Sequence, residues 1–151
     1  MEKFASVNDA LDFAIDREQE AYEMYTELAA QMKNPGIKAT FTQFAGEELG
    51  HKAKLESVKA GKKLEPVKKK ILDLKIGDYL VDIKPKKGMS YQEALILAMK
   101  REHAAYTMYK DFASRAPDNE IQTLFLGLAQ EEAKHKLRFE VEYDENILKD
   151  N

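Results

Sequence analysis

The chain repeats itself: shifted by 84 residues, its first part matches its second part without a gap. The matching positions include acids, aromatic residues and histidines. They pair Glu18 with Glu102, Tyr25 with Tyr109, Glu48 with Glu132, and His51 with His135. Because self-similarity of this kind indicates a structural unit used twice, the sequence predicts two similar halves.

Each half contains two stretches in which apolar residues recur at spacings of three and four, the inward stripe of a bundle helix. The stripes of the first half are Val7, Leu11, Ala14, Glu18, Ala21, Tyr25, Leu28 and Met32, then Ile37, Phe41, Phe44, Glu48, His51, Leu55 and Val58. Those of the second half are Tyr91, Leu95, Ala98, Glu102, Ala105, Tyr109, Phe112 and Ala116, then Ile121, Phe125, Leu128, Glu132, His135 and Phe139. The sequence therefore predicts an all-α protein with four helices.

Breaks in the pattern place the helices in two antiparallel pairs. Asn34–Gly36 interrupts the first half and 117–119 the second, each with proline beside asparagine or aspartate. Ser6 is a predicted N-cap, and Ser90 with Glu93 predicts a capping box. The predicted helix pairs span 4–61 and 90–150, and the last helix is expected to run on towards residue 147.

The stretch between the pairs, 62–89, is rich in lysine, proline and glycine. Two parts of it, 72–76 and 79–83, alternate apolar and polar residues, which suggests extended pieces. A connection this long can return the chain along the whole bundle, so that helices two and three run parallel. We expect one domain over 1–151, a four-helix bundle with one long crossover between helices 2 and 3.

Composition excludes several kinds of protein. The chain has no cysteine, which rules out disulfides, thiolate zinc sites and cysteine-ligated iron sites within it. A formal charge of −3 gives no basic field for nucleic acid. No apolar run approaches the roughly 20 residues of a membrane span. We expect a cytoplasmic protein that binds neither nucleic acid nor membrane.

Six ionisable residues lie on stripes that are otherwise apolar, where an unpaired carboxylate is costly. They are Glu18, Glu48, His51, Glu102, Glu132 and His135. Each histidine follows a glutamate by three residues, so both side chains leave one helix face a turn apart. Measured from the breaks, the six residues lie at matching heights along the helices, near the middle of the bundle.

Charge and ligand type point to a pair of metal ions in this layer. Four carboxylates carry −4, no lysine or arginine lies on a stripe to offset them, and two divalent cations would balance them. Carboxylates bridging two ions, with one histidine on each, would satisfy charge and coordination together. Such ligands suit iron or manganese better than calcium and do not separate iron, manganese and zinc. The alternative is a buried polar network without metal.

These residues resemble the ferritin-like superfamily and, within it, the rubrerythrin-like di-iron carboxylate proteins. The resemblance covers about 4–60 and 88–150 and every one of the six ligands. It implies two iron ions held by Glu18, Glu48, His51, Glu102, Glu132 and His135, with manganese or zinc as substitutes. It also implies that Tyr25 and Tyr109 hydrogen-bond ligand carboxylates. The chain departs from rubrerythrin proper in two ways. It lacks the rubredoxin domain. It also lacks the additional glutamate that rubrerythrins have about one turn beyond the helix-three ligand, where this chain has Ala104–Tyr106.

The first functional hypothesis is an oxidoreductase, a peroxidase or ferroxidase, that reacts with hydrogen peroxide or dioxygen. It needs an external electron donor, such as a rubredoxin-like protein. The second is iron oxidation and handling, and the third is a binding scaffold whose metals act as staples. The repeat also suits a homodimer, with domain swapping as one way to build it.

Three further charged or polar side chains near the predicted ligands are expected to lie outside the metal site. Glu47 and Glu131 lie one position off the stripes, and we expect each to pair with a lysine on the helix surface. His103 follows Glu102 and is expected at the surface.

Overall fold

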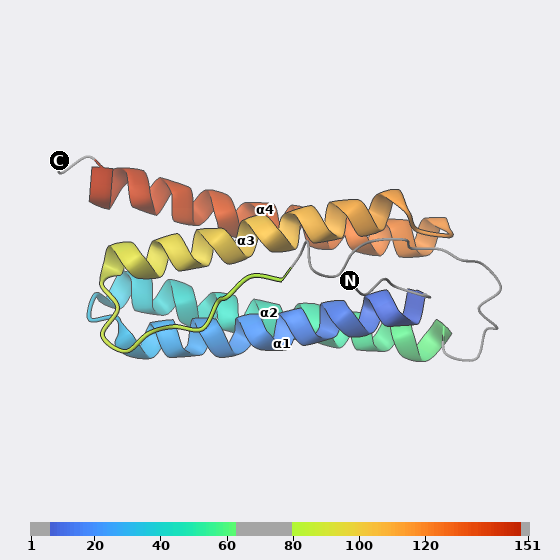
Figure 1. The fold of residues 1–151 in the computed structure, drawn as a ribbon, viewed down its shortest axis with the longest axis horizontal. Coiled ribbons are helices and arrows are strands. Elements are labelled where there is room, and N and C mark those ends of the chain that lie inside the picture. Colours follow the sequence, from blue (N-terminus) through green and yellow to red (C-terminus); the bar gives the residue numbers. More distant parts are fainter. Residues whose placement is uncertain (1–6, 63–79, 149–151) are drawn as a thin grey trace.

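The computed structural model describes residues 7–62 and 80–148, which form four long helices (Figure 1). The helices are α1 (Val7–Gln31), α2 (Pro35–Lys62), α3 (Tyr91–Ser114) and α4 (Asn119–Tyr143), and a short π-helix, η2 (Asp144–Leu148), continues α4. The predicted all-α fold is confirmed. Ser6, the predicted first N-cap, lies outside the described residues.

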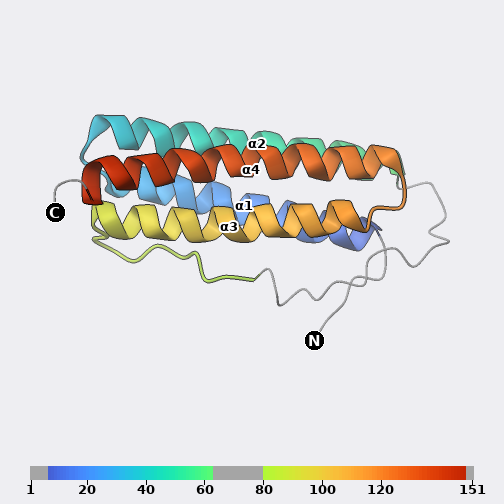
Figure 2. The ribbon, with the colours of Figure 1, turned by 90° about the horizontal axis from the view of Figure 1, so that it is seen from above.

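The helices pack in the two predicted pairs, α1 with α2 and α3 with α4. Figure 1 shows that the members of each pair run in opposite directions, whereas α2 and α3 run the same way. Seen from above, all four lie side by side along the long axis (Figure 2). The direction of the chain is therefore up, down, down, up, as the long crossover predicts. None of the described helices is long and apolar enough to cross a membrane.

Local side-chain contacts fix where three of the helices begin. At the start of α2, Asn34 Oδ1 accepts hydrogen bonds from the backbone N–H of Gly36 at 2.8 Å and of Ile37 at 3.3 Å. Asp118 caps α4 through the N–H of Ile121. At α3, Ser90 Oγ accepts from the N–H of Glu93. Glu93 in turn accepts from the N–H of Ser90, which completes the predicted capping box.

Replacing Ser90 by alanine should lower the free energy of unfolding by about 1 kcal/mol, because the first turn of α3 loses its hydrogen-bond acceptor. Urea unfolding followed by circular dichroism measures this. Ser114→Ala is a suitable control, since its hydroxyl only donates back to the carbonyl of Asp111 within the same helix. Equal losses in the two variants would contradict a specific role for the cap.

The stripes predicted from the sequence form the core of the bundle. Two apolar clusters result, one around Leu11, Phe112 and Phe125, the other around Tyr25, Phe41 and Phe139. Both bury their central side chains completely. The acidic residues of the stripes lie between these two clusters, so apolar side chains pack above and below them along the bundle axis.

The end of the crossover packs against the bundle. Residues 80–86 form neither helix nor strand, and 72–76 and Tyr79 lie outside the described residues. Ile83 is buried, and Val81 packs against the same core cluster. Gln31 of α1 donates to the carbonyl of Lys86 and accepts from the N–H of Met89, each at 2.8 Å. Residues 80–90 therefore run along the α1 and α3 side of the bundle (Figure 2).

Candidate metal centre

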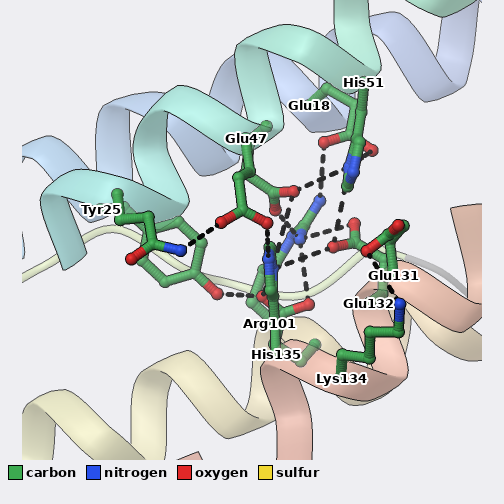
Figure 3. A network of polar contacts seen from close by, with 12 residues as sticks. Glu18, Tyr25, Glu47, His51, Arg101, Glu131, Glu132, Lys134 and His135 are labelled. Atoms are coloured by element: carbon green, nitrogen blue, oxygen red, sulfur yellow. Dashed lines mark hydrogen bonds and ion pairs between the residues drawn. The ribbon is translucent and has the colours of Figure 1, made fainter. Parts of the chain in front are cut away.

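The structure brings together all six residues that the sequence predicts as metal ligands. Figure 3 labels four of them, Glu18, His51, Glu132 and His135. α1 and α3 each supply one glutamate, and α2 and α4 each supply a glutamate and a histidine. Two groups form, in each of which the candidate ligand atoms lie within 4.8 Å of one another. The first is Glu18, Glu48, His51 and Glu132, and the second is Glu48, Glu102, Glu132 and His135. Because Glu48 and Glu132 belong to both, the two groups form one continuous site.

The site is enclosed. All four glutamates are 0% exposed, and the side chains of His135 and His51 are 3% and 12% exposed. Among the described residues, five buried atoms of the cluster have no hydrogen-bond partner. They are Glu48 Oε1, both carboxylate oxygens of Glu132, and Nδ1 of His51 and of His135. Their close neighbours are ion-pair contacts that lack hydrogen-bond geometry, such as His51 Nδ1 at 3.0 Å from Glu48 Oε1 and Arg101 at 2.8 Å from Glu132 Oε2. Because buried polar atoms normally form hydrogen bonds, these converging oxygens and nitrogens fit coordination to metal ions.

Two buried tyrosines support the cluster across the repeat. Tyr25 of the first half donates its hydroxyl proton to Glu102 of the second. Tyr109 of the second half donates to Glu18 of the first, at 2.5 Å. Burial and the nearby carboxylates raise the pKa of both tyrosines well above 10.0, so that both hydroxyls remain donors. Each lone glutamate is thus oriented by the opposite half of the chain.

One buried cation in the site was not expected from the sequence. Arg101 of α3 is 3% exposed, and its guanidinium extends into the middle of the cluster (Figure 3). It pairs with Glu48, and it lies 2.8 Å from Glu132, 3.3 Å from Glu102 and 3.4 Å from Glu18. The expectation that no lysine or arginine offsets the four carboxylates is therefore wrong. Arg101 lies one position before the stripe residue Glu102, and a count of stripe residues omits it.

Burial and the guanidinium shift the pKa values of the carboxylates in opposite directions. Burial raises the pKa of Glu102 to about 7 and raises that of Glu48 well above its ordinary value. Burial acts the same way on Glu132, but Arg101 and the histidines outweigh it and lower its pKa. For His135, burial opposes the charged form, yet the carboxylates of Glu102 and Glu132, at 3.3 and 3.4 Å from its Nδ1, raise the pKa to about 11. In this arrangement Arg101 and bound protons take much of the charge balance that metal ions would supply.

Glu47 corrects a second expectation. Rather than pairing with a lysine, it reaches across from α2 so that Glu47 Oε1 lies 2.9 Å from His135 Nε2, while Gln43 donates to its other oxygen. The hydrogen bond to His135 lowers the pKa of Glu47 despite its partial burial. Its repeat partner, Glu131, does pair with a lysine, at 3.8 Å from Lys134. His103 is exposed as expected.

The two halves of the cluster therefore differ. His135 has a carboxylate behind its outer ring nitrogen and the ring of Phe44 stacked on it, with ring centroids 3.8 Å apart. The contact between Glu47 and His135 joins residues 88 apart in the sequence. Helical spacing within one helix gives no signal for such a contact.

The family model described as Rubrerythrin matches residues 9–143 of the chain. No curated protein matches it.

Among solved structures, a candidate ferritin-like diiron-carboxylate protein from Thermotoga maritima superposes with a TM-score of 0.80. It is 19% identical, and the match covers 97% of this chain and 99% of that one. A hypothetical protein from Pyrococcus furiosus gives a TM-score of 0.70 at 24% identity, over 92% of this chain and 89% of that one. A conserved hypothetical protein from Mycobacterium tuberculosis gives 0.67 at 15% identity, over 88% and 93%. These likenesses show the ferritin-like fold.

Proposed function

Because this chain belongs to the rubrerythrin family, we propose that its buried cluster holds two iron ions and that the protein is a di-iron carboxylate oxidoreductase. Its substrates are hydrogen peroxide or dioxygen, and its electrons come from an external donor such as a rubredoxin-like protein. The observation that carries the proposal is the pair of four-residue ligand groups that share Glu48 and Glu132.

Each ligand has a distinct place in this proposal. Glu48 and Glu132, which belong to both groups, would be shared between the two ions. Glu18 and His51 would complete one position, and Glu102 and His135 would complete the other. Carboxylate oxygens with one imidazole per ion are a ligand set that iron accepts, and manganese or zinc would also fit.

A reduced iron pair would supply two electrons to the oxidant. The protein's own residues hold the ligands still and exclude water. Tyr25 and Tyr109 fix the two lone glutamates through hydrogen bonds. Phe44 covers the face of His135, and Phe139 packs edge-on against Phe44 with centroids 5.2 Å apart. The His51 side is less enclosed, since that side chain is 12% exposed, and we place the entry of a small oxidant there.

The position of the additional rubrerythrin glutamate carries no carboxylate in this chain. Ala105 is 6% exposed, and Ala104 is partly buried beside it. A mechanism that exchanges a histidine ligand for that glutamate is therefore not available at this site. Turnover must use the six ligands present, with the supporting hydrogen bonds described above.

The test begins with metal analysis of anaerobically purified protein, followed by optical titration with hydrogen peroxide and with dioxygen. We expect two irons per chain and oxidation of the reduced protein by at least one oxidant, repeated when a chemical reductant is supplied. Ferric iron leaving the protein after each oxidation would instead indicate iron handling. A protein that holds two irons but turns over neither oxidant with any reductant would refute the oxidoreductase and leave the metal-stapled scaffold.

Replacing Glu47 by glutamine should weaken metal binding by about 10- to 100-fold, because His135 loses the carboxylate that orients its ring and raises its basicity. Competition between the protein and a chromophoric chelator for zinc(II) measures this affinity. Glu131→Gln is the matched control: it makes the same change at the repeat position, where the carboxylate pairs with Lys134 on its own helix. Equal effects of the two substitutions would argue against a role for Glu47 at the site.

A further inference from the structure

We propose that the Arg101 guanidinium is an internal cation that competes with metal ions for this cluster, leaving it when ions bind and holding it together when they do not. The inference rests on the proposed metal site but concerns a residue outside the ligand set. Among the described residues, Arg101 is the only lysine or arginine that is buried. Its contacts reach one glutamate from each of the four helices.

The guanidinium and a pair of ions would use the same oxygens. Arg101 Nη1 lies 2.8 Å from Glu132 Oε2 and also pairs with Glu48 Oε2, and both glutamates belong to both ligand groups. Two divalent ions already balance four carboxylates, so a retained guanidinium would leave an excess positive charge in a buried layer. Buried charge without a partner is costly. Full loading of the site and the observed position of Arg101 are therefore mutually exclusive.

The internal repeat shows how such an arginine sits when it lies outside the cluster. Arg17 is the repeat partner of Arg101, and its side chain is 21% exposed. Its Nε lies 3.6 Å from Glu20, one turn further on, and its guanidinium lies 4.6 Å from the centre of the Phe13 ring. The position that corresponds to Glu20 in the second half is Ala104. Arg101 therefore lacks the carboxylate that holds Arg17 outside.

A small hollow, with room for about one water molecule, lies beside Arg101 outside the cluster. It is bordered by α1, α3 and the end of the crossover, and its lining includes Arg17 as well as Arg101, Glu20, Val81, Ile83 and Met108. The apolar side chains there can pack against the aliphatic stem of an arginine, and Glu20, the partner of Arg17, lies at the same hollow. Arg101 already borders this hollow, so its side chain has a route out of the cluster on that side.

The decisive experiment measures zinc(II) affinity by competition with a chromophoric chelator, and urea stability after chelator treatment. Arg101→Met should bind zinc at least about tenfold more tightly, a change within the range of typical coupling free energies between two bound species. Without metal it should unfold at a lower urea concentration than the unsubstituted protein, because four buried carboxylates lose their cation. Arg17→Met, the same change at the repeat position, should leave the zinc affinity unaltered.

A second variant keeps the arginine. Ala104→Glu supplies the carboxylate that Arg17 has, so it should hold Arg101 outside and also raise zinc affinity, even if Arg101→Met folds poorly. Unchanged or weaker zinc binding in both variants would overturn the displacement of Arg101. If neither the unsubstituted protein nor Arg17→Met binds zinc, iron(II) or manganese(II), the proposed metal site itself is refuted. Failure of the Arg101 displacement is thus distinguishable from failure of the proposed metal site.

Discussion

Replacing Glu48 by alanine is expected to reduce the metal content of the purified protein from two ions per chain to less than one. Glu48 belongs to both ligand groups, so its loss removes an oxygen from each position at once. The expected loss of affinity exceeds about 100-fold, the upper end of what removing a hydrogen-bond partner from behind a ligand costs. Elemental analysis of anaerobically purified protein measures the content, and circular dichroism verifies that the helices persist.

Two further variants sharpen this result. Glu18→Ala removes a member of only one group and should spare the position formed by Glu102 and His135, leaving about one ion. Glu131→Ala removes an exposed carboxylate beside a ligand and should leave both. Full occupancy in Glu48→Ala and in His135→Ala would refute the assignment of the ligands.

The largest expected effect on stability is that of Phe139→Ala, which should lower the free energy of unfolding by about 3–5 kcal/mol. Phe139 is 0% exposed. Its ring lies 5.9, 5.5 and 5.2 Å, centre to centre, from those of Tyr25, Phe41 and Phe44. Alanine would leave a cavity among three aromatic rings, two of which border the metal centre. Urea unfolding monitored by circular dichroism gives the free energy.

Leu137→Ala is the matched control on the same helix. That side chain belongs to a residue 60% exposed, so its truncation should change stability by no more than about 0.5 kcal/mol. Because Tyr25 packs against Phe139, the phenylalanine variant should also lower metal affinity, which Leu137→Ala should not. A loss below about 1 kcal/mol in Phe139→Ala would show that the surrounding rings close the cavity.

Much of this fold is readable from the sequence because its main signal is periodic. The apolar stripes determine which face of each helix is buried, and the interruption at Asn34–Gly36 separates α1 from α2. The same periodicity shows that Glu18 and His51 share a level, since the rise per residue is constant along a helix. Convergence of the six acids and histidines therefore follows from counting residues along straight helices.

The contacts that sequence reasoning missed depend on side-chain direction between helices. Arg101 leaves α3 next to a stripe residue, and only the packed structure shows that its long side chain turns inward. Glu47 lies off its own stripe but reaches a histidine on another helix. Both are charged residues at stripe edges, where periodicity predicts a surface position and three-dimensional packing decides otherwise.

The crossed hydrogen bonds from Tyr25 to Glu102 and from Tyr109 to Glu18 make the two helix pairs depend on each other. The pair α1 and α2 alone would leave Glu18 without the hydroxyl of Tyr109, and the pair α3 and α4 alone would leave Glu102 without the hydroxyl of Tyr25. Neither half of the chain therefore completes its own part of the site, although the two halves are similar in sequence.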